Sequence, residues 1–246
     1  MNKHVLFWSI TVGLGGMLFG LDVAVISGAE LAIQALWKLD SWTHGLAIAT
    51  ALYGTVIGAA VGGIPADRFG RKPTLLWIGL SFFISSIGAA LASNVEYFML
   101  FRFLGGLGIG ASSVVAPIYI SEIAPPKHRG KLVISFQLNV VLGILIAYIS
   151  NYFIQGMENG WRIMLGVVGI PSLLFSVLIL FTPETPTFLL LKRNDVEGAK
   201  KVLALADPNL EETIQRITDN QQSQIKGERL FSKKFITPLV LSFLFS

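Results

Sequence analysis

Six long apolar stretches constrain the fold of this chain more than any other feature of its sequence. A helix needs about 20 apolar residues to cross the hydrocarbon core of a bilayer, and each stretch reaches that length. They cover residues 5–28, 46–66, 73–92, 97–120, 132–154 and 163–182. Each is too long for a core strand and lacks the turn residues that separate barrel strands. The pattern predicts an all-α membrane protein with six spans.

Charge and composition support a membrane protein and set its orientation. Only 14% of the residues are charged, against about a quarter in soluble domains. The basic residues cluster at the N-terminus and in the second and fourth loops, which hold seven of them, whereas the first, third and fifth loops hold two. Basic residues favour the cytoplasmic side, so the N-terminus is predicted to be cytoplasmic. The net charge of +4 then needs no nucleic-acid partner.

The chain divides into three predicted parts. Residues 1–182 form the six-span bundle. Residues 183–234 are more polar, with leucines and alanines at helical spacing, which predicts two or three amphipathic helices in a cytoplasmic linker. Residues 235–246 are apolar again, but they would reach only about 18 Å as a helix, too short to cross a bilayer. We expect this segment to be the start of a truncated seventh span.

Two charged residues lie deep within the spans, Asp22 in the first and Arg102 in the fourth. An acid near a helix centre costs roughly 2.5–3.5 kcal/mol on insertion, so it is usually retained for a role. Asp22 could carry a proton, bind an ion, or form a buried ion pair that only joins two helices. Arg102 is its natural partner. Such a pair would act as a proton switch, because ionised Asp22 attracts Arg102 and protonated Asp22 releases it.

Small residues recur at a spacing of four in several spans. Gly16 and Gly20 form one ridge, and Gly54, Gly58 and Gly62 form another. Such ridges allow helices to approach closely, and we interpret them as packing surfaces. The string from Gly62 to Lys72 follows the second ridge and combines one acid with three bases. It predicts a tight cytoplasmic turn with a defined charge network.

This string resembles the signature between the second and third helices of the major facilitator superfamily. Further strings resemble the sugar porter family of that superfamily. They are GGMLFGLD with VISG in the first span, RFLGG and PIYISEIAP around the fourth, RGKL in the fifth, and GWR with PETP around the sixth. The resemblance runs through essentially the whole chain, in order and at natural spacing.

The resemblance implies a fold, an activity and a set of site residues. Family members have two six-helix bundles joined by a cytoplasmic helical segment, and they rock about a central sugar to alternate access. This chain resembles the N-terminal bundle, so the C-terminal six-helix half would be its missing partner. Asp22 matches the residue that couples transport to protons, and Arg102 matches its partner. Matching substrate-binding positions are Phe19, Gln137 and Ile144. Matching positions of a cytoplasmic gating network are Asp67, Arg68, Arg71, Glu122, Arg129 and Glu184.

Three positions depart from the family pattern. Leu21 stands where many members have tyrosine, and Thr187 replaces a common arginine of the gating network. Ile144 stands where xylose-type members have a second sugar-binding glutamine, which favours a hexose. The prediction is proton-coupled hexose transport in the plasma or inner membrane, with sugar, protons and the bilayer as partners. A facilitative uniporter and a non-transporting, sensor-like or truncated half-transporter remain alternatives.

Enzyme chemistry finds little support in the sequence. A rhomboid-type protease needs a serine and a histidine within the membrane, but His4, His44 and His128 lie outside the spans. The chain has no cysteine, which excludes disulfides and thiolate metal sites. The glycines between Gly106 and Gly110 only weakly resemble a dinucleotide loop, because no strand precedes them. We expect no enzyme activity, no metal and no cofactor.

Overall fold

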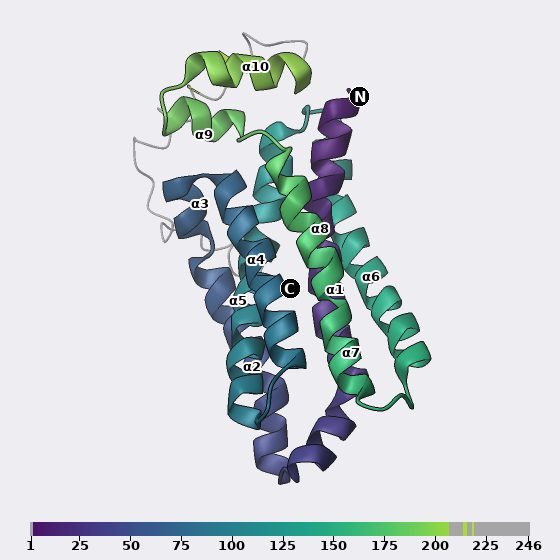
Figure 1. Ribbon diagram of the computed structural model, residues 1–246. Coiled ribbons are helices and arrows are strands. Elements are labelled where there is room, and N and C mark those ends of the chain that lie inside the picture. The colour runs from purple at the N-terminus through teal and green to yellow at the C-terminus, as the bar shows by residue number, and fades with distance from the viewer. Residues whose placement is uncertain (1, 207–213, 216–217, 219–246) are drawn as a thin grey trace, which may run out of the picture.

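The computed structural model describes residues 2–206, 214–215 and 218, and the regular elements within them are helices (Figure 1). The elements are α1 (Lys3–Trp37), α2 (Ser41–Val61), α3 (Gly63–Phe69), α4 (Arg71–Ala90), α5 (Val95–Ile123), α6 (Arg129–Ile154), α7 (Gly160–Val167), α8 (Gly169–Leu180), α9 (Pro186–Leu191) and α10 (Val196–Ala206). Among the described residues, six helical segments are long and apolar enough to cross a membrane, with α7 and α8 together forming the sixth. This confirms the six predicted spans.

Several predicted boundaries were wrong. The first span continues past residue 28 to Trp37, and the second begins at Ser41 rather than at residue 46. Residues 29–40 contain no proline or glycine that would end the first helix. The side chain of Asp40 accepts a hydrogen bond from the Trp42 amide and so caps the start of α2. The sixth span is interrupted at Val168. Three residues later, Pro171 lacks the amide hydrogen that a continuous helix would use.

The string from Gly62 to Lys72 contains a short helix, whereas the sequence predicted a tight turn. Its first half forms the short helix α3, and the chain reverses at Gly70 before α4 begins. Gly70 has φ +113°, a conformation that residues with a side chain rarely adopt. The predicted turn is therefore a helix followed by a glycine corner.

The bundle is built around two closely packed helix pairs, α1 with α6 and α2 with α5. A Cβ atom at Gly20 would overlap the Val140 carbonyl oxygen, and one at Gly58 would overlap the Leu107 carbonyl oxygen. Both ridges predicted from the sequence therefore serve helix packing, because the absent side chains let backbones meet. Helix α4 packs on both α5 and α8 and so joins these two helices within the bundle.

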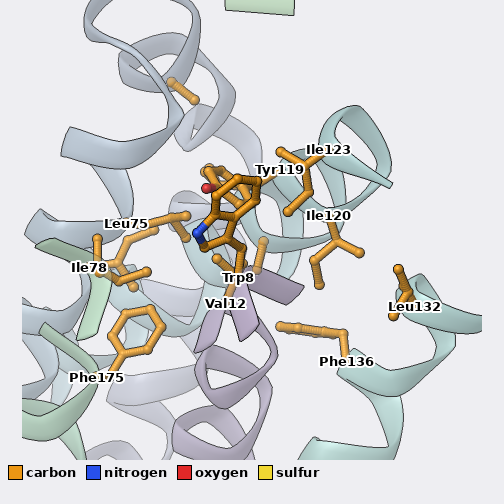
Figure 2. Close-up of a cluster of buried hydrophobic side chains, with 14 of the residues drawn as sticks. Trp8, Val12, Leu75, Ile78, Tyr119, Ile120, Ile123, Leu132, Phe136 and Phe175 are labelled. Atoms are coloured by element: carbon orange, nitrogen blue, oxygen red, sulfur yellow. The ribbon is translucent and has the colours of Figure 1, made fainter. Parts of the chain in front are cut away.

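Bulky apolar side chains fill the interior of the bundle. Figure 2 shows Trp8 from α1, Tyr119 from α5, Phe136 from α6 and Phe175 from α8 gathered in one buried cluster. Helices α9 and α10 lie over the end of the bundle that holds the N-terminus (Figure 1), and Leu189 joins the same cluster. The predicted cytoplasmic linker thus contains two short helices, α9 and α10, within residues 183–206. Its remainder, apart from residues 214–215 and 218, and the predicted seventh span at 235–246 lie outside the described residues.

Candidate functional site

The centre of the candidate site is an ion pair buried between α1 and α5. Nη1 of Arg102 donates to both carboxylate oxygens of Asp22, each at 2.8 Å. Nη2 of Arg102 also lies 3.4 Å from the Asp22 carbonyl oxygen. Each side chain is only 3% exposed. The two residues that the sequence paired therefore lie in direct contact, shielded from the surroundings of the bundle.

Local packing on α4 and α5 makes room for this pair. Gly105 follows Arg102 by one turn, and a Cβ atom there would overlap the Ser85 hydroxyl and lie 3.8 Å from Oδ1 of Asp22. The Ser85 hydroxyl donates to the Phe101 carbonyl at 2.6 Å, which joins α4 to α5 beside the arginine. Gly105 and Ser85, which lie beside the ion pair, are therefore both small. The hydrogen bond from Ser85 also helps α4 to hold α5 in place.

The bonding of Arg102 is incomplete. Its Nε is buried and has no hydrogen-bond partner among the described residues. Because a buried donor without a partner costs free energy, the arrangement is less well satisfied than a two-nitrogen, bidentate contact would be. The Asp22 carboxylate accepts the hydrogen bonds that Arg102 donates to side chains among the described residues. The stability of the pair therefore depends strongly on the charge of Asp22.

The three predicted substrate-binding residues lie on α1 and α6. Phe19 is half-buried and packs against the core cluster, as does Ile144. The side chain of Gln137 is exposed. Among the described residues, none of these three side chains hydrogen-bonds to the ion pair, so their assignment to a sugar site stays a prediction.

A second polar cluster lies at the end of the bundle near α3 and contains four of the six predicted gating residues. Arg71 is its centre. Nη2 of Arg71 lies 3.1 Å from Oδ1 of Asp67 and 3.1 Å from Oε1 of Glu122, and Nη1 donates to the Ala66 carbonyl at 3.1 Å. The cluster therefore ties α3 and α4 to the end of α5.

Glu184 joins this cluster through the backbone rather than through a salt bridge. Its carboxylate accepts hydrogen bonds from the amides of Arg71, Lys72 and Thr185, at 2.9–3.3 Å. The first two amides open α4, where the helix dipole also favours a negative charge. A Cβ atom at Gly70 would overlap the Glu184 carboxylate. The glycine corner and this acid therefore depend on each other.

Two predicted gating residues, Arg68 and Arg129, lie outside the cluster. Both are exposed, and neither makes a salt bridge within the described part of the chain. The motif places Arg68 only three residues from Arg71, but Arg68 lies on α3 whereas Arg71 opens α4 after Gly70. Arg68 instead lies over the ring of Phe69, at 5.4 Å.

The sequence analysis missed three polar contacts that fix helix positions. The Tyr119 hydroxyl donates to the Pro183 carbonyl at 2.8 Å. The Asn151 amide donates to the Val25 carbonyl at 3.2 Å. Arg162 donates to the Ala90 carbonyl at 2.6 Å. A buried asparagine within a span is itself a signal, but the carbonyl partners of all three residues depend on tertiary structure.

No group of three side chains able to hold a metal ion occurs among the residues that the structure describes. His4 lies in the first turn of α1, His44 in the first turn of α2, and His128 immediately before α6. Two of the three histidines therefore lie at the ends of membrane-spanning helices, and His128 lies just before one.

Comparison with known proteins identifies the family. The family model described as "Sugar (and other) transporter" matches residues 8–245. The chain belongs to this sugar transporter family. Family members are transporters rather than enzymes, and the six apolar helices make this chain a multi-pass membrane protein.

Individual relatives of this chain support the same conclusion. The chain is 40% identical over 211 residues to a D-xylose transporter of Levilactobacillus brevis, covering 85% of this chain and 46% of the relative. It is 37% identical over 235 residues to the arabinose-proton symporter of Bacillus subtilis (strain 168), covering 93% and 50%. It is 35% identical over 235 residues to the galactose-proton symporter of Escherichia coli (strain K12), covering 94% and 50%.

Solved structures show the same fold. The bromodeoxyglucose complex of the proton:xylose symporter XylE, a major facilitator superfamily protein, aligns with a TM-score of 0.87 at 33% identity. The alignment covers 94% of this chain and 56% of XylE. The chain thus has the fold of the N-terminal half of such a transporter, and it spans about half the length of the curated relatives it matches.

Proposed function

We propose that this chain forms the N-terminal bundle of a proton-coupled sugar transporter that works by alternating access. The observation that carries the proposal is the ion pair between Asp22 and Arg102, in which both side chains are 3% exposed. Intramembrane ionisable residues of this kind are rare and mark ion or proton pathways. The named proton symporters for arabinose and galactose support the same activity for this family member.

Protonation of Asp22 is the proposed coupling step. While Asp22 is ionised, its two oxygens hold Arg102 and α1 stays joined to α5. When Asp22 binds a proton, the attraction falls and the buried guanidinium must find other partners. The change loosens α1 from α5, and we propose that this favours movement of the bundle around bound sugar.

Sugar would bind beside α1 and α6, where Phe19, Gln137 and Ile144 lie. Gln137 supplies an exposed amide that can bind sugar hydroxyls, and Phe19 supplies an apolar surface for the ring. Ile144 cannot hydrogen-bond a hydroxyl, and it stands where the resemblance places a sugar-binding glutamine in xylose-type members, so we propose a hexose. The other sugar contacts would come from a second six-helix half.

The cluster around Arg71 is the proposed gate on the cytoplasmic side. Asp67, Glu122 and Glu184 hold α3, α4, α5 and the chain after α8 together at that end. This placement assumes a cytoplasmic N-terminus and a location in the plasma or inner membrane, as the distribution of basic residues predicts. The same cluster would latch the outward-facing state and open during the transport cycle.

The substitution Asp22→Asn tests the proposed coupling in the complete gene product that carries this chain, expressed in cells without their own hexose uptake. Asparagine removes the charge but keeps the size of the side chain. We expect sugar accumulation against a gradient to be lost, while exchange of labelled for unlabelled sugar continues. The matched control is Asp40→Asn, which keeps the exposed cap of α2, because asparagine also caps helices. Accumulation by the Asp22→Asn variant would refute the coupling role.

A further inference from the structure

An apolar groove with a volume of about 310 Å³ lies between α2, α4 and α5, beside α3. It belongs to neither the ion pair nor the cluster around Arg71. Its inner wall contains Gly58, Gly62 and Gly108, and its rim contains Phe69 and Trp77. Phe69 is 57% exposed and Trp77 is 70% exposed. The groove is therefore an open slot in a membrane-spanning bundle, lined mainly by carbon atoms.

The same glycines that join α2 to α5 create this groove. Because Gly58 and Gly62 have no side chain, α2 lies directly on the α5 backbone, near Leu107 and Ala111. Helix α4 packs on α5 beside them, so a narrow channel remains between α2 and α4. Along α4 the groove extends from Thr74 to Ser81, which is about 10 Å at 1.5 Å per residue. Its length follows the helices and its open side faces away from the core.

A basic residue, Arg68, lies at the α3 end of the groove. Arg68 is exposed, and its guanidinium lies 5.4 Å from the centre of the Phe69 ring, which forms part of the rim. Within the described part of the chain it makes no salt bridge. Its basic neighbours differ, because Arg71 is held by two acids and Lys72 Nζ donates to the Leu180 carbonyl at 2.9 Å. Arg68 is therefore available to an anion at this position.

We propose that the groove binds an acyl chain of an anionic phospholipid, whose phosphate contacts Arg68. The arrangement matches this ligand in two respects. An apolar channel runs along the membrane-spanning helices from the level of α3, and a cation, Arg68, lies where the channel reaches the start of α4. Tryptophans such as Trp77 are enriched near the headgroup level, and basic residues beside a membrane attract anionic lipids. This site is independent of the proposed sugar transport.

Trp77 provides a probe for the test, because bromine atoms on an acyl chain quench nearby tryptophans. The complete gene product that carries this chain is placed in phosphatidylcholine vesicles that contain brominated phosphatidylglycerol or, separately, brominated phosphatidylcholine. The chain has five tryptophans, so the difference between the wild type and Trp77→Phe isolates the signal of Trp77. We expect Trp77 to be half-quenched at about a fivefold lower fraction of phosphatidylglycerol than of phosphatidylcholine, the factor for one basic residue near an anionic lipid.

Three variants separate the headgroup contact from the groove. Arg68→Gln should remove the preference for phosphatidylglycerol, whereas Lys131→Gln, which removes an equally exposed charge from the first turn of α6, should keep it. Ser81→Phe should fill the groove and weaken quenching by both lipids, with folding checked by circular dichroism.

Four results would overturn the proposal. They are equal quenching by both lipids in the wild type, equal losses in the Arg68 and Lys131 variants, no quenching of Trp77, and displacement of the brominated lipid by soluble glycerol phosphate. The third result would mean that protein covers the groove, and the fourth that the site binds phosphate alone.

Discussion

Removing Arg102 while keeping Asp22 is expected to destabilise the bundle more than removing both charges. In Arg102→Met, the Asp22 carboxylate stays buried without its partner. Two unit charges about 3 Å apart attract each other by about 5 kcal/mol at an effective dielectric constant of 20. Measurements on other proteins assign about 3–5 kcal/mol to the loss of one partner from a buried pair. We therefore expect Arg102→Met to lower the free energy of unfolding by that amount.

The double variant Asp22→Asn, Arg102→Met tests the reasoning behind this magnitude. It contains no buried charge, and neutral replacements of a buried pair often preserve stability. We expect it to recover most of the loss, so that the two substitutions are strongly non-additive. Simple loss of packing at Arg102 would instead leave the double variant at least as unstable as the single one.

Thermal unfolding in detergent, followed by tryptophan fluorescence, measures the effect. For a chain of this size, 1 kcal/mol corresponds to about 2–4 °C in Tm, so the single variant should unfold about 6–20 °C below the wild type. Lys131→Met is the control, since Lys131 is exposed and its loss should shift Tm by less than about 2 °C. A single variant as stable as this control, or a double variant less stable than the single one, would refute the reasoning.

Two further substitutions test the glycines that shape the bundle. Gly58→Ala should destabilise it by about 1–3 kcal/mol, because the new Cβ would overlap the Leu107 carbonyl oxygen, whereas Gly63→Ala, with open space around it, should be nearly neutral; equal Tm values would contradict the packing role. Gly70→Ala should cost about 1–3 kcal/mol in backbone strain and displace the Glu184 carboxylate. Hydrogen exchange should then accelerate at the first amides of α4, and unchanged exchange there would show that Glu184 does not cap them.

The number of spans could be predicted from the sequence because apolar length alone decides whether a helix can cross a bilayer. The boundaries were less accurate, as shown by the continuation of α1 to Trp37. The extension packs Trp37 against Phe98 and Trp161, with ring centres 5.7 and 5.6 Å apart. Local sequence could not reveal this, because the partners come from α5 and α7.

The candidate site was predictable to different degrees. Asp22 and Arg102 could be paired from the sequence, since each is the sole charge deep in its span and burying either alone is expensive. Four of the six predicted gating residues lie in the cluster around Arg71, and the gating role of all six stays a prediction. Arg68 and Arg71 belong to one motif, but Arg68 lies on α3 and Arg71 opens α4 after Gly70, and Arg71 contacts Glu122. A motif records which charges occur together and does not record where each side chain points.

The sequence by itself therefore determined the membrane class, the six spans and the two charges that must find each other inside the bundle. The reason is that burying a charge, or a backbone N–H or C=O group without a hydrogen bond, in lipid costs several kcal/mol, which excludes most other folds. Only the tertiary structure decided how α2 and α4 lie on α5, where the groove beside Arg68 opens, and that Glu184 reaches the start of α4. These features depend on contacts between residues far apart in the chain, where side-chain shape and helix position jointly select the partner.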